Sequence, residues 1–359
     1  MSAELFKAAF ISYGDPLAIP DDNSIESVAL QNLLVDLRRA LRGQKKAIGS
    51  GGPIYCDLLD NPTFNALATK RHTHEFITLF AGAIDRIFRT CFYLLSDPLV
   101  LTSVGDPSGE LLNPEMLKSI KSRGFAAGPL WLPKNQNRVM AARELALLTC
   151  FFILLHEAGH IIRCHSAFLQ RKYGLVDYEE LPASSMTPDL SDIRMAFEWE
   201  ADEYAAATSY QLVQVLWQDQ RFKFINAAHA DTVWAMSASL TFMLIAWISG
   251  GDILRRSPSH PSPFFRYLWS MTAVASASEC KPFGQDHEAT QQGFGEIAGW
   301  FRRNSLTLPV GESPPTIEVF KAEYDRVRAT LSKESALLDE LGAERLDGAT
   351  AWLKTNGVK

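Results

Sequence analysis

The sequence predicts an α+β fold that is mostly helical, with a small sheet. Three observations support this class. Residues 135–174 contain no proline and no internal breaker before Gly159, which predicts one long helix. Two short apolar runs, at residues 76–80 and 128–133, have the length and composition of strands. From about Thr316 onward, the chain has the composition of a charged helical tail.

The first third of the chain mixes helices with short strands. An amphipathic helix is expected through about Arg42, because apolar residues recur there at steps of three and four. The strand at residues 76–80 should turn at Gly82 into a helix that ends near Pro98. Prolines bound the run at residues 128–133, which suits a strand at the edge of a sheet.

The remaining elements are expected to be helical. The middle of the long helix is apolar nearly all round, so it should lie in the core. A polar loop with two prolines follows it, and the next helix should start near Ser191 or Asp192. We therefore expect three parts: an N-terminal helical and strand portion, a core, and a charged helical tail, at residues 1–135, 136–305 and 306–359.

The composition is that of a globular protein without affinity for nucleic acid. The chain has 359 residues, of which 47% are hydrophobic and 21% charged, enough for a large core. Its formal net charge is -6, and the Lys and Arg residues are spread along the chain rather than clustered. We expect no nucleic-acid partner.

The cysteines and the N-terminus indicate a cytoplasmic protein. The five cysteines are odd in number, lie far apart and form no CxxC pair. They therefore predict neither a disulfide framework nor a thiolate metal site. The N-terminal residues lack the basic start, apolar centre and cleavage site of a signal peptide.

One segment leaves contact with a membrane open as an alternative. Residues 232–251 contain no charged residue and are about long enough to cross a bilayer. Ser and Thr dilute the apolar character, and Asp231 and Asp252 flank the segment in place of basic anchors. A buried core helix is favoured over a membrane segment.

The stretch "HEAGH" within the long helix has the pattern of a metal centre. His156 and His160 lie four residues apart, so on a helix both imidazoles can reach one ion. Glu157 lies beside that ion rather than on it, where it can take a proton from a water that the ion activates. Catalytic zinc sites use three protein ligands, so a third ligand must come from another element.

Two schemes compete for the third ligand. In one, a histidine six residues beyond the second would close the site, but position 166 is Ser. His165 is about 140° off the metal face of a continuing helix, so we interpret it as an ordinary polar residue. In the other scheme, "FEWEADEYAA" forms a second helix on which Glu198 and Asp202 share one face. Glu200 should then point to solvent.

Three motifs in order resemble the gluzincin metallopeptidases of the HtpX and CAAX-prenyl-protease type. They are "HEAGH", "EWEAD" and "SHPSPFFR", and the match covers residues 141–271. A looser likeness, at "NPTFNALATKRHTHEFITLFAGAIDRIF", is to the phage-exclusion Lit type of bacterial peptidase. The resemblance implies a zincin-like (minigluzincin-type) core, with a small mixed sheet beside the active-site helix.

The resemblance also implies roles for individual residues. Glu198 would be the third ligand of a zinc ion (Zn2+), and Asp202 would accept the free N–H of a ligand histidine. His260 would steady the oxyanion on the attacked carbonyl, with Tyr204 as a weaker candidate. Arg266 would pair with a carboxylate such as Asp202 or Glu200.

The function implied is that of a zinc-dependent endopeptidase with Glu157 as general base and a protein or peptide as substrate. Such an enzyme could be a regulatory or defence peptidase that acts on one host protein. The alternatives are a non-catalytic sensor or interaction protein stabilised by zinc, and a membrane-associated quality-control protease.

Overall fold

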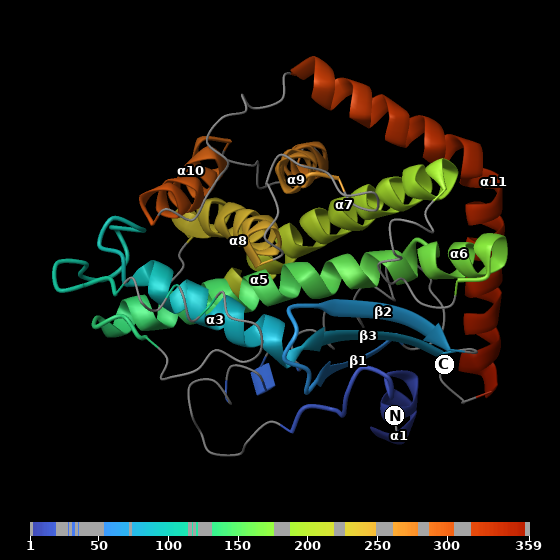
Figure 1. The fold of residues 1–359 in the computed structure, drawn as a ribbon, viewed down its shortest axis with the longest axis horizontal. Coiled ribbons are helices and arrows are strands. Elements are labelled where there is room, and N and C mark those ends of the chain that lie inside the picture. Colours follow the sequence, from blue (N-terminus) through green and yellow to red (C-terminus); the bar gives the residue numbers. More distant parts are fainter. Residues whose placement is uncertain are drawn as a thin grey trace.

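The computed structural model describes residues 3–18, 54–71, 74–113, 131–175, 187–218, 227–248, 261–278, 287–304 and 317–355, with positions 28, 31, 32, 35, 117 and 120. This part of the chain is mostly helical with one small mixed sheet, which confirms the predicted α+β class (Figure 1). The helix predicted through Arg42 falls almost entirely outside it.

The described elements follow one another in the order shown by the colours of Figure 1. The strands are β1 (Ile54–Leu59), β2 (Ala66–Arg71) and β3 (His74–Phe80). The helices are α1 (Ala3–Ala9), α3 (Ala81–Leu95), α5 (Gln136–Ile162), α6 (His165–Tyr173), α7 (Pro188–Gln218), α8 (Ala227–Ile248), α9 (Pro263–Ser278), α10 (His287–Arg303) and α11 (Ile317–Thr355).

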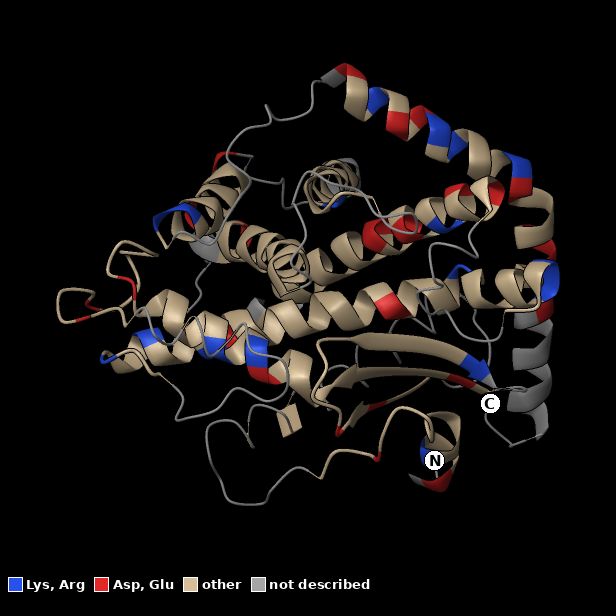
Figure 2. Ribbon diagram, viewed as in Figure 1, with Lys and Arg blue, Asp and Glu red and all other residues tan. Residues whose placement is uncertain are grey.

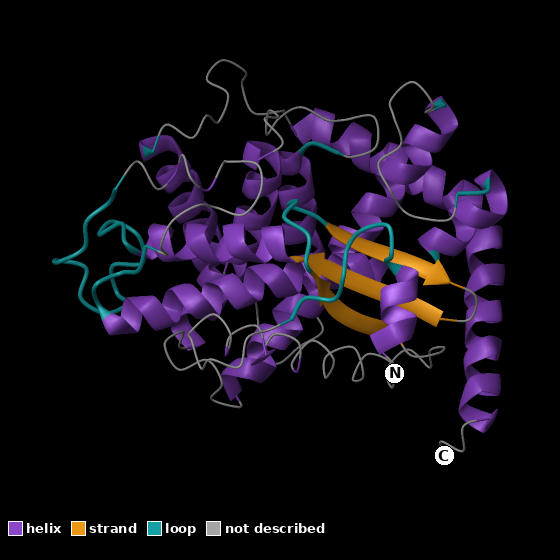
Figure 3. Ribbon diagram, turned by 60° about the horizontal axis from the view of Figure 1, so that its bottom comes forward, coloured by secondary structure: helices purple, strands orange, loops and turns teal. Residues whose placement is uncertain are grey.

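The sheet has the strand order β1-β3-β2, with β1 parallel and β2 antiparallel to β3. The predicted strand at residues 76–80 lies within β3 and is confirmed, whereas β1 and β2 were not predicted. One face of the sheet packs on α1 and the other on the helical body (Figure 3). β2 lies at the edge beside α5, as Figure 1 shows.

The turn from β3 into α3 depends on Gly82. A Cβ atom at this position would lie 2.1 Å from the carbonyl oxygen of Pro62, far inside van der Waals contact. The Gly82 N–H also donates to the carbonyl of Asn61 at 2.8 Å. The predicted turn into a helix is thus confirmed, with a glycine that no other residue could replace without moving the backbone.

The predicted long helix is two helices in the structure. Asn135 caps α5, because its side chain accepts hydrogen bonds from the backbone N–H groups of Asn137 and Arg138. α5 ends at Ile162, and Cys164 adopts a left-handed conformation with φ 61° before α6 begins. The single helix predicted for residues 135–174 is therefore wrong at this break, and α6 ends at Tyr173, where Gly174 forms the C-cap.

A second prediction is also corrected. Residues 131–133 form no strand, and residues 128–130 lie outside the described part of the chain. The edge strand beside α5 is instead β2, which comes earlier in the sequence. α7 begins at Pro188, slightly before the predicted start near Ser191.

The core is built around α5, which packs against α3, α7, α8 and the sheet. Two apolar stretches, Gln136–Ile162 and Ala230–Ile248, are long enough to cross a membrane, but 89% of the most apolar window of each is buried within the fold. This burial favours the core-helix interpretation of residues 232–251 over the membrane segment. Almost no charged residue lies on α8 (Figure 2).

The C-terminal helix α11 lies across α6 and α7 and carries many charges of both signs (Figure 2). Its apolar face packs on both helices, and ion pairs flank that contact. Arg171 pairs with Glu344 at 2.9 Å, and Lys172 pairs with Glu334 at 2.8 Å. The exposed Arg171–Glu344 pair adds little to this contact, since a surface ion pair contributes about 0 to 1 kcal/mol.

Candidate metal centre

Three side chains from two helices converge on one point. His156 and His160 project from α5 and Glu198 from α7, and all three are buried. The two Nε2 atoms are 3.0 Å apart, and each lies 3.5 Å from a carboxylate oxygen of Glu198. This predicted group is confirmed as a set of residues that could hold a metal ion.

Close packing of α5 on α7 brings these residues together. Gly159 lies between the two histidines, and a Cβ atom there would be 3.0 Å from Cα and 3.2 Å from O of Ala201. Ala201 lies between Glu198 and Asp202 on the facing helix. Small residues on both helices therefore permit the approach that the three-ligand group needs.

Asp202 and Arg266 hold the group from behind. The Nδ1 atom of His156 lies 2.9 Å from Oδ1 of Asp202. Arg266, on α9, binds both carboxylate oxygens of Asp202 at 2.7 and 2.9 Å and approaches Oε2 of Glu198 at 3.1 Å. Both the predicted contact of Asp202 with a ligand histidine and the predicted pairing of Arg266 with Asp202 are present.

The charges of the site call for a cation. The carboxylates of Glu198 and Asp202 both pair with the guanidinium of Arg266, and the carboxyl group of Glu157 lies close enough to feel its charge, so among the described residues the carboxylates outnumber this guanidinium in a largely buried region. A buried charge without a partner destabilises the folded protein by roughly several kcal/mol, even after the surrounding protein has relaxed. A proton on His156 or a metal ion between the three ligand atoms would supply the missing positive charge.

The two ligand histidines differ in their affinity for protons. Burial works to lower the pKa of His156, but its hydrogen bonds and charge interactions with Asp202 and Glu198 outweigh burial and raise the pKa to about 10. Burial and the neighbouring His156 hold the pKa of His160 well below its usual value. The two Nε2 atoms lie at hydrogen-bond distance, so without a metal one of them must carry a proton, and the raised pKa of His156 favours a proton there.

Glu157 lies between α5 and the edge strand β2. The backbone N–H of Ala68, on β2, donates a hydrogen bond to its carboxylate. Burial raises the pKa of Glu157 to about 7, with the charges of His156 and Arg266 acting in the opposite direction. The side chain can therefore gain or lose a proton near neutral pH beside the three-ligand group.

His165 and Glu200, which the sequence analysis placed outside the site, lie next to the ligand His160. The Nδ1 atom of His165 lies 3.0 Å from Nδ1 of His160, and its Nε2 atom lies 3.0 Å from Oε2 of Glu200. Burial lowers the pKa of His165. The interpretation of His165 as an ordinary polar residue is wrong because α5 ends before it, and Glu200 bonds to it rather than pointing freely to solvent.

No sequence signal marks the break between α5 and α6, because neither Arg163 nor Cys164 is a residue that usually ends a helix.

The two candidate oxyanion donors remain predictions. His260 lies outside the described residues. Tyr204 is buried on α7, and its Cβ faces Gly159.

Comparisons with protein-family models, with curated proteins and with solved structures found no match to this chain.

Proposed function

We propose that the chain is a zinc-dependent endopeptidase. The observation that carries the proposal is the position of Glu157, whose carboxylate lies beside a buried group of two histidines and a glutamate. A purely structural metal site holds no water to be activated, so it does not need a carboxylate beside its ligands. The resemblance of the three motifs to gluzincin metallopeptidases points to the same reaction and to a zincin-like core.

The donor set fits zinc. Two imidazole nitrogens and one carboxylate are ligands that catalytic zinc sites use, and they leave a fourth position for water or substrate. The 3.0 Å between the two Nε2 atoms is near the roughly 3.3 Å expected for two nitrogens on one tetrahedral zinc ion. When bound, zinc would polarise the attacked carbonyl and make water a stronger nucleophile at neutral pH.

Glu157 is the general base in this proposal. It accepts a proton from the attacking water and delivers it to the leaving amine, and both steps require a carboxyl group that titrates near neutral pH. In the metal-free protein, burial raises the pKa of Glu157 to about 7, and the charge of a bound zinc ion would act in the opposite direction and favour the ionised base. Asp202 and Arg266 keep His156 and Glu198 in place, and His260 is the proposed donor to the oxyanion.

The substrate is proposed to bind as an added strand along β2. This strand has β3 on one side, while its other side lies beside α5 and Glu157. An extended peptide paired with a sheet edge uses backbone hydrogen bonds for affinity and alternate side chains for specificity. A protein substrate would have to present an extended, accessible segment.

Metal analysis and activity of the wild type and Glu157→Gln test the proposal. We expect one equivalent of zinc in both proteins. Cleavage of a peptide mixture, followed by mass spectrometry, should fall roughly 100- to 10,000-fold in the variant, because only the base is lost. Glu203→Gln, an acid on α7 away from the ligands, is the matched control and should cleave like the wild type.

The other outcomes separate the alternatives. A wild type that holds no metal at neutral pH would overturn the proposal. A wild type that holds zinc but cleaves nothing in the peptide mixture would favour the non-catalytic zinc-stabilised sensor. Labelling of new protein termini in cells would then identify a specific host substrate, as a regulatory or defence peptidase requires.

A further inference from the structure

A row of three hydrogen-bonding groups runs outward from the metal centre. It starts at His160, passes through His165 and ends at Glu200, with both junctions at 3.0 Å. The three groups come from three helices, because His160 lies on α5, His165 opens α6, and Glu200 lies on α7. Such a row across helices cannot arise from local sequence alone.

The direction of the hydrogen bonds follows from the ligand atom of His160. Its Nε2 faces the other ligands, and when this nitrogen binds the metal ion it uses its lone pair, which leaves the proton of the neutral ring on Nδ1. The Nδ1–H of His160 then donates to Nδ1 of His165. The remaining proton of His165 lies on Nε2 and donates to the carboxylate of Glu200. Each ring has one possible tautomer in this arrangement.

The middle of the row is held rigidly. His165 has no exposed surface, and its ring stacks on Phe197 at 4.0 Å between centroids with 5° between the planes. Cys164, directly before it, adopts the left-handed conformation that turns the chain back toward α5. A non-glycine residue in this region costs about 1 to 3 kcal/mol and is kept only where the surrounding structure requires it.

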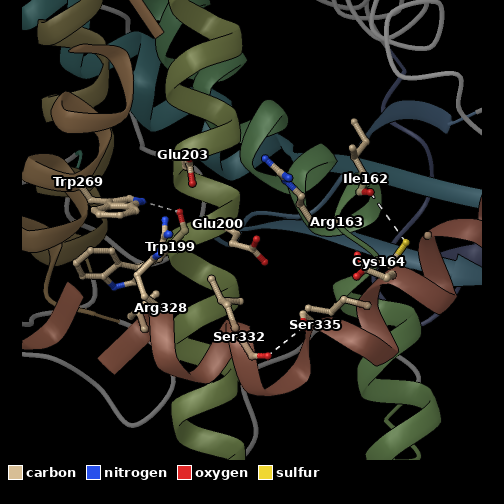
Figure 4. A pocket seen from close by; sticks show the side chains of 15 residues that line it. Ile162, Arg163, Cys164, Trp199, Glu200, Glu203, Trp269, Arg328, Ser332 and Ser335 are labelled. Atoms are coloured by element: carbon tan, nitrogen blue, oxygen red, sulfur yellow. Dashed lines mark hydrogen bonds between the residues drawn. The ribbon is translucent and has the colours of Figure 1, made fainter. Parts of the chain in front are cut away.

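The outer end of the row reaches a cleft. Glu200 lines a cleft of about 470 Å³ between α7 and α11, together with Arg163 and Glu203 (Figure 4). Its side chain keeps 20% of its surface exposed, whereas that of His165 is fully buried. A partly hydrated carboxylate can stay ionised, so it can anchor the neutral His165 ring by a charge-assisted hydrogen bond.

We propose that His165 and Glu200 are positioning residues that hold His160 in the tautomer and orientation required of a metal ligand. The inference rests on the proposed zinc site and extends it, since His156 has Asp202 for the same purpose and His160 has this row. Removal of groups that orient a metal ligand commonly weakens metal binding by about 10- to 100-fold.

Zinc affinity of four variants, measured by competition with a chelator, tests the proposal. His165→Phe keeps the ring stack on Phe197 but offers His160 no acceptor, so zinc should bind about 10- to 100-fold more weakly. His165→Asn offers a carbonyl oxygen in place of Nδ1 and should restore most of the loss. Glu200→Leu should weaken binding, and Glu203→Leu, the matched change one turn along the same helix, should not.

An NMR spectrum of the wild type tests the proposed tautomers of His160 and His165 even if a variant fails to fold. In the zinc-loaded protein, nitrogen-15 NMR of the histidine rings should show a proton on Nδ1 of His160 and on Nε2 of His165. A proton on Nδ1 of His165, or wild-type zinc affinity in folded His165→Phe, would overturn the proposal and leave the zinc site intact. A wild type without zinc would overturn the proposed function itself.

Discussion

His156 lies between two carboxylates, and at this position a proton and a metal ion compete for its Nε2 atom. Asp202 accepts from its Nδ1–H at 2.9 Å, and Glu198 lies 3.5 Å from its Nε2. The raised pKa of His156 means that the metal-free protein is stabilised by the bound proton below the ordinary histidine pKa, about 6.5. That contribution is lost as the pH rises through about 10.

Zinc binding at pH 8 should therefore release about one proton from His156, because zinc needs the Nε2 lone pair. The affinity should rise by roughly tenfold per pH unit until the pH approaches the raised pKa of His156. Calorimetry in two buffers of different ionisation enthalpy measures the proton count.

Asp202→Asn is the matched variant for this measurement. The amide still accepts from Nδ1–H but no longer carries the charge that raises the pKa of His156, so fewer protons should be released. Identical heats in both buffers for the wild type would contradict the assignment of a bound proton to His156.

At the scale of elements, the contact between α5 and α7 determines whether the ligands meet. The helices approach closely at Gly159 and Ala201, where even a Cβ atom on Gly159 would lie only 3.0 Å from Cα of Ala201. The break between α5 and α6 also shapes the site, because it returns His165 toward His160. Both features place groups from different helices within one site.

Gly159→Ala should weaken zinc binding by about tenfold or more, because the added methyl group pushes Glu198 away from the two histidines. Alanine normally stabilises a helix interior by about 1 kcal/mol over glycine, but the contact with Ala201 should remove that gain. Chelator competition and chemical unfolding measure the two effects.

Gly295→Ala is the control for the helix effect alone. Gly295 lies in α10, and a Cβ atom there would meet nothing within 4 Å. We expect the free energy of unfolding to rise by about 0.5 to 1 kcal/mol with zinc affinity unchanged. Equal zinc affinities of Gly159→Ala and the wild type would show that helix spacing does not control the centre.

At the scale of the whole molecule, the most apolar helices form the interior and the charged helix forms the outside. α5 and α8 have enough apolar length for a bilayer, yet they are covered by the sheet, α3, α7 and α10. α11 closes the side that carries α6 and α7. The apolar residues of α5 and α8 are thus buried against other parts of the protein.

We expect the protein to stay in the supernatant when lysed cells are centrifuged at high speed, since burial of α5 and α8 leaves little apolar surface for lipid. Immunoblotting of the two fractions measures this. Recovery in the pellet after an alkaline carbonate wash would support the membrane-associated protease instead.

The sequence predicted much of the candidate site because its signals are local. His156, Glu157 and His160 share one helix, Glu198 and Asp202 share another, and the spacing within each helix follows from its geometry. The apolar run before the motif likewise predicted a buried helix. Such features depend on a few neighbouring residues, so no knowledge of the fold is needed.

The strand β2 could not be predicted in the same way. The β2 segment, "ALATKR", contains alanine and lysine, which are uncommon in strands, and it is stabilised by pairing with the buried β3. The edge beside α5 therefore depends on contacts with a neighbouring strand rather than on the residues of β2.

From the sequence alone, helical spacing was enough to identify His156 and His160 as metal ligands and Glu157 as the acid beside them, whereas the choice of Glu198 as the third ligand came from the resemblance of the motifs. The folded structure was needed to show that α5 ends before His165, that Glu200 bonds to His165, and that Arg266 pairs with Glu198 as well as with Asp202. Those arrangements depend on packing between helices far apart in the chain, where burial and hydrogen bonding outweigh local preference.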